Sequence, residues 1–114
     1  MTVVGIGARS DVTTEEVLAA VDAVLPADAT DVRLATLAAR AGEPGIAGAA
    51  AARGWRLTGY SATELAQIRV PSPSDAVAEH VGTGSVAEAA ALISGGELVV
   101  PKTVHGRVTV AVSR

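Results

Sequence analysis

Residues 2–26 read TVVGIGARSDVTTEEVLAAVDAVLP, which is a short apolar run, a glycine-containing loop and an amphipathic helix in that order. The run Val3–Ile6 ends at Gly7 and is typical of a buried strand that leads into a tight loop. Residues 13–16 form a capping box, and apolar side chains recur on one face of the following helix until Pro26 stops it. A strand followed directly by a helix favours an α/β fold.

The same alternation continues to the end of the chain. We expect further strands at 31–36, 55–60, 98–101 and 107–112, and helices at about 44–54, 61–68, 75–81 and 85–95. Capping boxes at Ser61–Glu64 and Ser85–Glu88 open two of these helices, and the last two strands are expected to pair. The sequence therefore predicts a single three-layer α/β domain, residues 1–114, in which a mixed β-sheet of about five strands has helices on both faces.

The composition argues against several classes of function. A net charge of −3, a pI near 5.2 and an aromatic content of 2% disfavour a nucleic-acid-binding face, which needs basic and stacking side chains. Without cysteine the chain has no disulfide and no thiolate nucleophile. His80 and His105 are isolated, so we expect no metal and no other cofactor. The N-terminus lacks a signal-peptide pattern and the Ala-rich stretch 45–52 is too short to span a bilayer, so we expect a cytoplasmic protein without membrane contact.

The first stretch that could carry chemistry is Gly5-Ile-Gly7-Ala-Arg9. Glycines after a strand let backbone amides approach a pyrophosphate, but the third glycine of a dinucleotide fingerprint is missing. Three interpretations stay open. They are a nucleotide site, a tight turn that needs glycines sterically, and a carboxylate-binding loop in which Arg9 makes a bidentate contact.

A second stretch places Thr36, Arg40 and Glu43 in one strand-to-helix connection. Such connections usually bind the ligands of α/β folds, so these residues are candidates for a binding site. Arg40 and Glu43 also have the spacing of an ordinary surface ion pair, which is the alternative.

A third candidate site combines a helix start with a cation. Thr83, Gly84 and Ser85 precede a predicted helix, whose free amides could receive an anion; alternatively Ser85 and Glu88 simply cap that helix. Lys102 is the only lysine of the chain and is expected at the end of a strand, either as a ligand contact or as a solvated loop residue.

Together these stretches resemble a known family. The chain contains, in order, GIGAR (5–9), LATLAARAGEPGI (34–46), VGTGSVAEAAAL (81–92) and LVVPK with VTVAVSR (98–114). This succession resembles that of the CobE / CbiG C-terminal family of cobalamin biosynthesis over about the whole chain, and VGTGSVAEAAAL is its most specific part. The chain resembles the free-standing form of the family rather than the longer members with extra N-terminal domains.

The resemblance implies a role in corrin-ring synthesis. The longer members are cobalt-precorrin-5A hydrolases, which open a lactone and release acetaldehyde, and the free-standing form is assigned to the aerobic route. The implied partner is a precorrin-type tetrapyrrole intermediate, with other enzymes of the corrin pathway as further candidates. The alternative is a non-enzymatic binding or carrier module.

The resemblance also implies which residues form the site. The family's motif positions that match here are Gly5, Gly7, Arg9, Thr36, Glu43, Gly82, Thr83, Ser85, Glu88 and Lys102. The chain departs from the family at Ala8, where related chains often have Cys, and at Arg40, where they often have Lys.

Each group of site residues has an expected role. Arg9, Arg40, Lys102 and the amides of 83–85 are expected to hold carboxylates of the intermediate. If the domain is a hydrolase, Glu88 or Glu43 is the candidate base that activates water.

Overall fold

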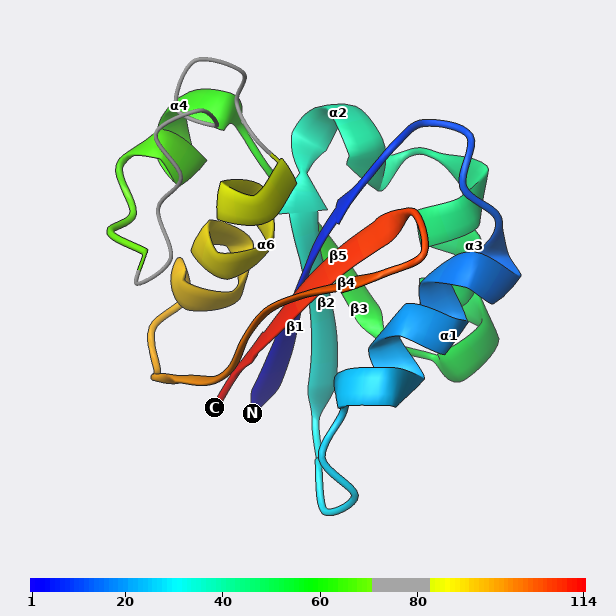
Figure 1. The fold of residues 1–114 in the computed structure, drawn as a ribbon, viewed down its shortest axis with the longest axis horizontal. Coiled ribbons are helices and arrows are strands. Elements are labelled where there is room, and N and C mark those ends of the chain that lie inside the picture. Colours follow the sequence, from blue (N-terminus) through cyan, green and yellow to red (C-terminus); the bar gives the residue numbers. More distant parts are fainter. Residues whose placement is uncertain (71–82) are drawn as a thin grey trace.

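The computed structural model describes residues 1–70 and 83–114, and their strands form one five-stranded sheet in the order β3-β2-β1-β5-β4 (Figure 1). The strands are β1 (Thr2–Ala8), β2 (Val32–Leu37), β3 (Arg56–Tyr60), β4 (Leu98–His105) and β5 (Val108–Ser113). β1, β2 and β3 are parallel, β5 is antiparallel to β1, and β4 is antiparallel to β5. The predicted mixed sheet is confirmed.

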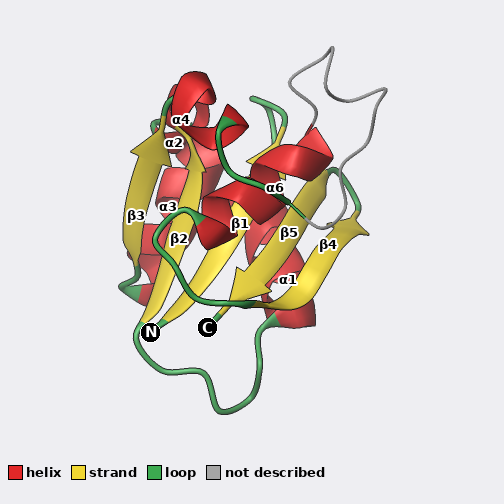
Figure 2. Cartoon of the chain, turned by 90° about the vertical axis from the view of Figure 1, so that its left-hand side faces the viewer, coloured by secondary structure: helices red, strands yellow, loops and turns green. Residues whose placement is uncertain are grey.

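Helices cover both faces of this sheet (Figure 2). One face carries α1 (Thr14–Val24) and α3 (Pro44–Arg53), the other α4 (Ala62–Ala66) and α6 (Thr83–Leu92), and the short α2 (Ala38–Ala41) follows β2. Side chains alternate along β1, because successive residues of a strand point to opposite faces. Val4 and Ile6 belong to the core under α1 and α3, and Val3 to the core under α6. The predicted three-layer arrangement is confirmed.

Local signals decide where several helices begin and end. The Thr13 hydroxyl accepts a hydrogen bond from the Glu16 N–H (3.1 Å), and the Thr13 N–H donates to the Glu16 carboxylate (3.2 Å). Ser61 and Glu64 form the same reciprocal pair at 3.0 and 2.9 Å. Gly54 ends α3 in the left-handed conformation, with φ of 68°, which a glycine adopts at no steric cost. These two capping boxes and this helix end confirm the prediction.

Two strands are longer than predicted. β1 continues through Gly7, which pairs with β5, so the loop after it starts later than the glycine pattern suggests. The strand predicted at 98–101 also ends too early, because β4 runs on to His105 and the chain turns only at Gly106, with φ of 62°. Pairing with β5 stabilises both extensions, and a local sequence window does not contain that partner. The predicted helix at 75–81 lies outside the described residues.

Candidate functional site

The carboxyl ends of the three parallel strands meet at one edge of the sheet, which we call the carboxyl edge. At β1 the strand pairing changes from parallel to antiparallel, since β2 is parallel to β1 on one side and β5 is antiparallel to it on the other. The helices that follow β1 and β2 lie on one face, whereas α6 lies on the other face and begins at this edge (Figure 1). Ligands of open α/β sheets bind at such a switch point.

Arg9 and Arg107 lie beside each other at the carboxyl edge. Ala8 pairs with Val108, so the next residues outward, Arg9 and Arg107, are neighbours across the ends of β1 and β5. Arg9 is exposed and has no hydrogen bond or ion pair with any other described residue. Within that part of the structure its guanidinium donors are available to a ligand.

Arg107 is held by two acidic side chains. It donates from Nε and Nη2 to the Glu16 carboxylate at 2.8 and 2.6 Å, and from Nη1 to the Asp11 carboxylate at 2.8 Å. The hydrogen bond from Arg107, helped by the Thr13 N–H, lowers the pKa of Glu16 from its ordinary 4.5 to about 2. These contacts fix the hairpin turn against the start of α1. This cluster could not be predicted from the sequence, because nothing in a local pattern joins residues that are 91 positions apart.

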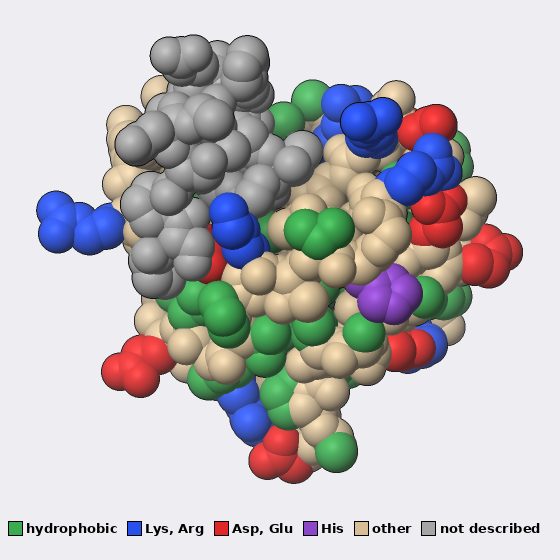
Figure 3. Space-filling view, in the orientation of Figure 1, with side chains coloured by type: hydrophobic (Ala, Val, Ile, Leu, Met, Phe, Trp, Pro, Cys, Tyr) green, Lys and Arg blue, Asp and Glu red, His purple; other side chains and the backbone are tan. Residues whose placement is uncertain are grey.

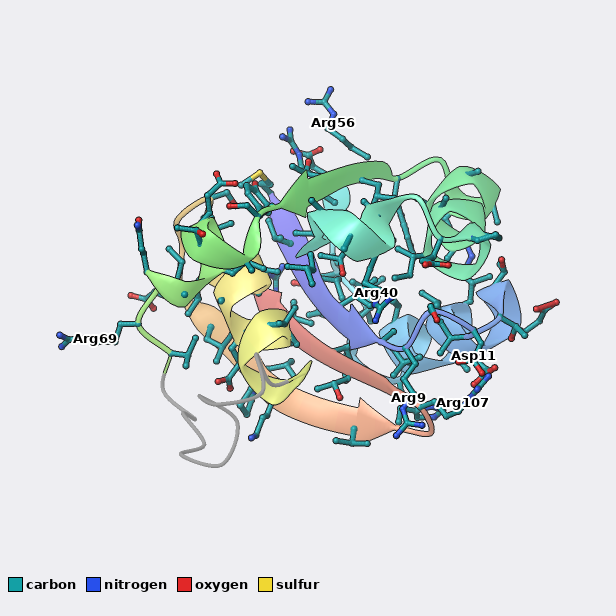
Figure 4. The ribbon with its side chains drawn as sticks, turned by 90° about the horizontal axis from the view of Figure 1, so that it is seen from above. Arg9, Asp11, Arg40, Arg56, Arg69 and Arg107 are labelled. Atoms are coloured by element: carbon teal, nitrogen blue, oxygen red, sulfur yellow. The ribbon has the colours of Figure 1, made fainter. Side chains whose placement is uncertain are left out.

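Arg40 and Glu43 lie at the same edge, after the end of β2. Arg40 Nη1 and Glu43 Oε1 are 3.8 Å apart and both side chains are partly exposed. This distance is too long for a hydrogen bond, so the pair leaves donors of Arg40 free to turn to a ligand. Figure 4 looks down on the carboxyl edge and shows Arg9 and Arg107 beside the hairpin, with Arg40 nearer the middle of the sheet.

The cations of this surface alternate with acids. In Figure 3, Lys and Arg side chains lie next to Asp and Glu along the upper right margin, and no continuous basic area is visible on this face. Any anion bound here would therefore depend on individual guanidinium groups rather than on a broad positive field.

Three predicted binding residues are buried behind the edge. Gly5 faces α6 so closely that a Cβ there would overlap the backbone carbonyl of Ala87. Gly7 is a buried residue of β1. Thr36 is fully buried, and its hydroxyl donates to the Ile6 carbonyl at 2.7 Å. Both glycines lie inside a strand and not in a strand-to-helix turn, and the close approach of α6 explains the glycine at position 5.

Glu88 and Lys102 are brought together between α6 and β4. Glu88 is fully buried, and its Oε2 accepts a hydrogen bond from the Lys102 N–H at 3.0 Å. α6 begins at Thr83, so the predicted helix start at Ser85 is two residues late and Ser85 lies in the first turn. The carboxylate of Glu88 connects α6 to β4 through this hydrogen bond.

Thr83, Gly84 and Ser85 form the first turn of α6, at the carboxyl edge. The first amides of a helix have no acceptor within it, and they carry the positive end of the helix dipole. The anion contact at 83–85 stays a prediction, and the backbone amides of the first helical turn are suited to it. Gly82 and His80 lie outside the described residues.

A hollow lies at the opposite edge of the sheet, at the amino ends of β2 and β3. It has a volume of about 470 Å³ and is lined by Ala29, Asp31, Val32, Arg33, Gly54, Trp55 and Arg56. None of the predicted site residues belongs to it. Across the ranges 1–70 and 83–114, no three His, Asp or Glu side chains gather as metal ligands would. The same ranges contain no helix with the length and apolar character needed to cross a membrane.

The fold and this edge define a small three-layer α/β domain with exposed guanidinium groups at the carboxyl ends of its parallel strands. The chain belongs to the family described as cobalamin synthesis G C-terminus, which it matches over residues 2–113. It is thus a cobalamin biosynthesis protein of the CbiG/CobE type, as the motif succession predicts.

Two solved structures are similar to it. One is the crystal structure of CobE, a protein from the cobalamin (vitamin B12) biosynthetic pathway, with 27% identity, a TM-score of 0.84 and coverage of 100% of this chain and 89% of that one. The other is the cobalamin biosynthesis protein chiG from Agrobacterium tumefaciens, with 31% identity, a TM-score of 0.72 and coverage of 99% and 97%. The search of curated proteins found no match.

Proposed function

We propose that this domain binds a precorrin-type tetrapyrrole intermediate at the carboxyl edge and hands it on within the corrin pathway. The observation that carries the proposal is the exposed guanidinium of Arg9, just after the end of β1, with the partly exposed guanidinium of Arg40 after the end of the adjacent β2. Arg9 has no partner among the described residues, so it is the first candidate for a ligand carboxylate.

The chemistry of such an intermediate fits this edge. Precorrins carry several acetate and propionate side chains around a ring, so they present many carboxylates in a broad, shallow outline. A guanidinium binds a carboxylate through two parallel hydrogen bonds, and separate guanidinium groups can hold separate carboxylates. The amides of 83–85 at the start of α6 offer a further anion contact at the same edge.

Binding is better supported than stand-alone hydrolysis. Glu88 is buried and its carboxylate is engaged by the backbone of β4, so it is a poor base for a water at the surface. Glu43 is the second candidate, since its carboxylate is partly exposed at the same edge. A hydrolase that opens a lactone with release of acetaldehyde would use Glu43 to activate water and the cations to stabilise the oxyanion.

The binding proposal is tested by titrating the protein into uroporphyrin, a porphyrin with eight carboxylates, and following the shift of its main absorption band. We expect Arg9→Ala to weaken binding about 10- to 100-fold, because a charge-assisted contact contributes roughly 1.5–3 kcal/mol. Arg56→Ala is the matched control, since Arg56 is also exposed but projects away from this edge (Figure 4). Equal affinity for the two variants, or no binding by the wild type, would contradict the proposal.

The two roles are separated with cobalt-precorrin-5A as substrate. A binding module shifts the spectrum of the intermediate without releasing acetaldehyde. A hydrolase releases acetaldehyde, and Glu43→Gln abolishes the release while the intermediate still binds.

A further inference from the structure

Glu88 is a buried titratable group that the proposed binding does not use. It is the only fully buried charged side chain among the residues that the structure describes, and it lies in an alanine-rich helix. Burial of a carboxylate is costly unless hydrogen-bond donors compensate it. A carboxylate at this position therefore indicates a specific role as a hydrogen-bond acceptor, beyond filling space.

The Lys102 N–H, which donates to Glu88, belongs to an irregular part of β4. Val100 pairs with Val112 and Thr103 pairs with Val110, so β4 advances by three residues over a stretch in which β5 advances by two. The extra residue is a β-bulge at 101–102, which disrupts the ladder locally. Pro101 has no N–H to donate, and the Lys102 N–H donates out of the ladder to Glu88 Oε2 at 3.0 Å.

We infer that Glu88 is a positioning residue, whose buried carboxylate holds this bulge and thereby fixes Lys102 for contact with the anionic ligand of the carboxyl edge. A bulge re-aims the side chain of the bulged residue, and the direction is fixed only if the freed backbone groups have firm partners. Glu88 supplies that partner from a different layer of the fold. The inference rests on the proposed function for its ligand, but the link between Glu88 and the bulge stands on geometry alone.

The depth of the two residues is compatible with this role. Glu88 is five residues into α6, about 7.5 Å from the helix start. Lys102 is three residues before the end of β4, about 10 Å from the same edge. A lysine has a long flexible stem, so a fixed backbone at Lys102 restricts where its ammonium group can reach.

The backbone link is tested by amide hydrogen exchange at Lys102, observed by NMR. Because this N–H lies outside the β4–β5 ladder, its protection depends on Glu88. We expect Glu88→Ala to accelerate its exchange at least tenfold relative to the amides of Val110 and Val112 in β5, which is paired on both sides, whereas Glu88→Gln, which keeps a carbonyl oxygen, retains most of the protection. Unchanged exchange in Glu88→Ala, or equal loss in both variants, would refute the link.

The functional part is tested with uroporphyrin in a double-mutant cycle. We expect Glu88→Ala and Lys102→Ala each to weaken binding about tenfold, and the double variant to be no weaker than Lys102→Ala, because Glu88 acts through Lys102. Glu88→Gln should bind within about threefold of the wild type. Additive losses would overturn the positioning role.

A control separates positioning from general loss of stability. Val17→Ala creates a cavity on the opposite face of the sheet, and it should leave the affinity for uroporphyrin unchanged. If Val17→Ala weakened binding as much as Glu88→Ala does, the effect of Glu88 would be one of stability and the inference would fail. Should the wild type not bind uroporphyrin, the proposed function fails, and the exchange at Lys102 still decides the backbone link.

Discussion

At the scale of single residues, the end of β2 shows how a polar side chain becomes part of the scaffold. Thr36 is fully buried next to β1, and its hydroxyl donates a hydrogen bond to the Ile6 carbonyl at 2.7 Å. This bond ties the side chain of one strand to the backbone of its neighbour. Arg9, at the end of that neighbouring strand, is exposed and has no described partner. Thr36 therefore has a scaffold role, and Arg9 is the residue that we propose for the ligand contact.

Removal of the Thr36 hydroxyl should affect stability and not binding. We expect Thr36→Val to lower the free energy of unfolding by about 1 kcal/mol, the usual contribution of one hydrogen bond, in a urea titration. The affinity for uroporphyrin should stay within about twofold of the wild type. A tenfold loss of affinity with unchanged stability would contradict the scaffold role and show that Thr36 contributes to binding.

At the scale of elements, the contact between α6 and β1 is unusually close. Gly5 removes a side chain from β1, and the facing positions of α6 are the small residues Ala87 and Ala91. The Ser113 hydroxyl of β5 donates to the Ala91 carbonyl, which adds a polar contact to the same interface. Small residues on both elements let the helix backbone approach the sheet. This contact positions the start of α6, whose amides are the proposed anion contact.

A methyl group at Gly5 should therefore be destabilising. We expect Gly5→Ala to lower the free energy of unfolding by about 1–3 kcal/mol, the typical cost of overpacking, because the new Cβ overlaps backbone atoms of α6. Gly42→Ala is the control, since Gly42 has an ordinary φ of −86° and a Cβ there meets no atom within 4 Å. Urea unfolding of the two variants tests this, and equal stabilities would show that α6 moves freely away from β1.

At the scale of the whole molecule, ion pairs join segments that are distant in sequence. Arg107 joins the hairpin to α1, Arg53 joins the end of α3 to Asp22 of α1, and Arg114 joins the last residue to Asp28. These guanidinium groups lower the pKa values of Glu16, Asp22 and Asp28. A depressed pKa means that the ionised carboxylate is favoured by folding, so these ties weaken in acid.

The Arg107 tie gives a prediction with a defined pH window. Its stabilising contribution is fully present above the ordinary pKa of 4.5 and is lost as the pH falls towards the folded value of about 2. We expect Arg107→Ala to raise the pKa of Glu16 in an NMR titration, though not fully to 4.5, because the Thr13 N–H still donates to this carboxylate. The urea midpoints of the wild type and Arg107→Ala should converge between pH 5 and pH 2.

The control for this prediction is Arg33→Ala, which removes a guanidinium that pairs with Asp31. The pKa of Glu16 should not change in it. If Arg107→Ala left the pKa of Glu16 near 2, the hairpin turn would not be what holds that carboxylate.

The sequence by itself determined the α/β class, the capping boxes at Thr13 and Ser61, and the end of α3 at Gly54. All of these depend on residues within a few positions of one another, so a local pattern contains their cause. The succession of four motifs also identified the family, because the order of the motifs along the chain is more specific than any one motif alone. The prediction of ligand-binding residues was less complete, since sequence shows which residues are polar but not which are buried.

Only the tertiary structure decided the roles of the remaining residues. Ser85 and Glu88 have the spacing of a capping box, yet α6 begins two residues earlier, and Glu88 accepts a hydrogen bond from Lys102 of β4, which lies in another layer. Gly5 serves the approach of α6, and Arg107 finds Glu16 across 91 positions. These outcomes depend on contacts between distant segments, whose free energy appears only when the sheet brings them together.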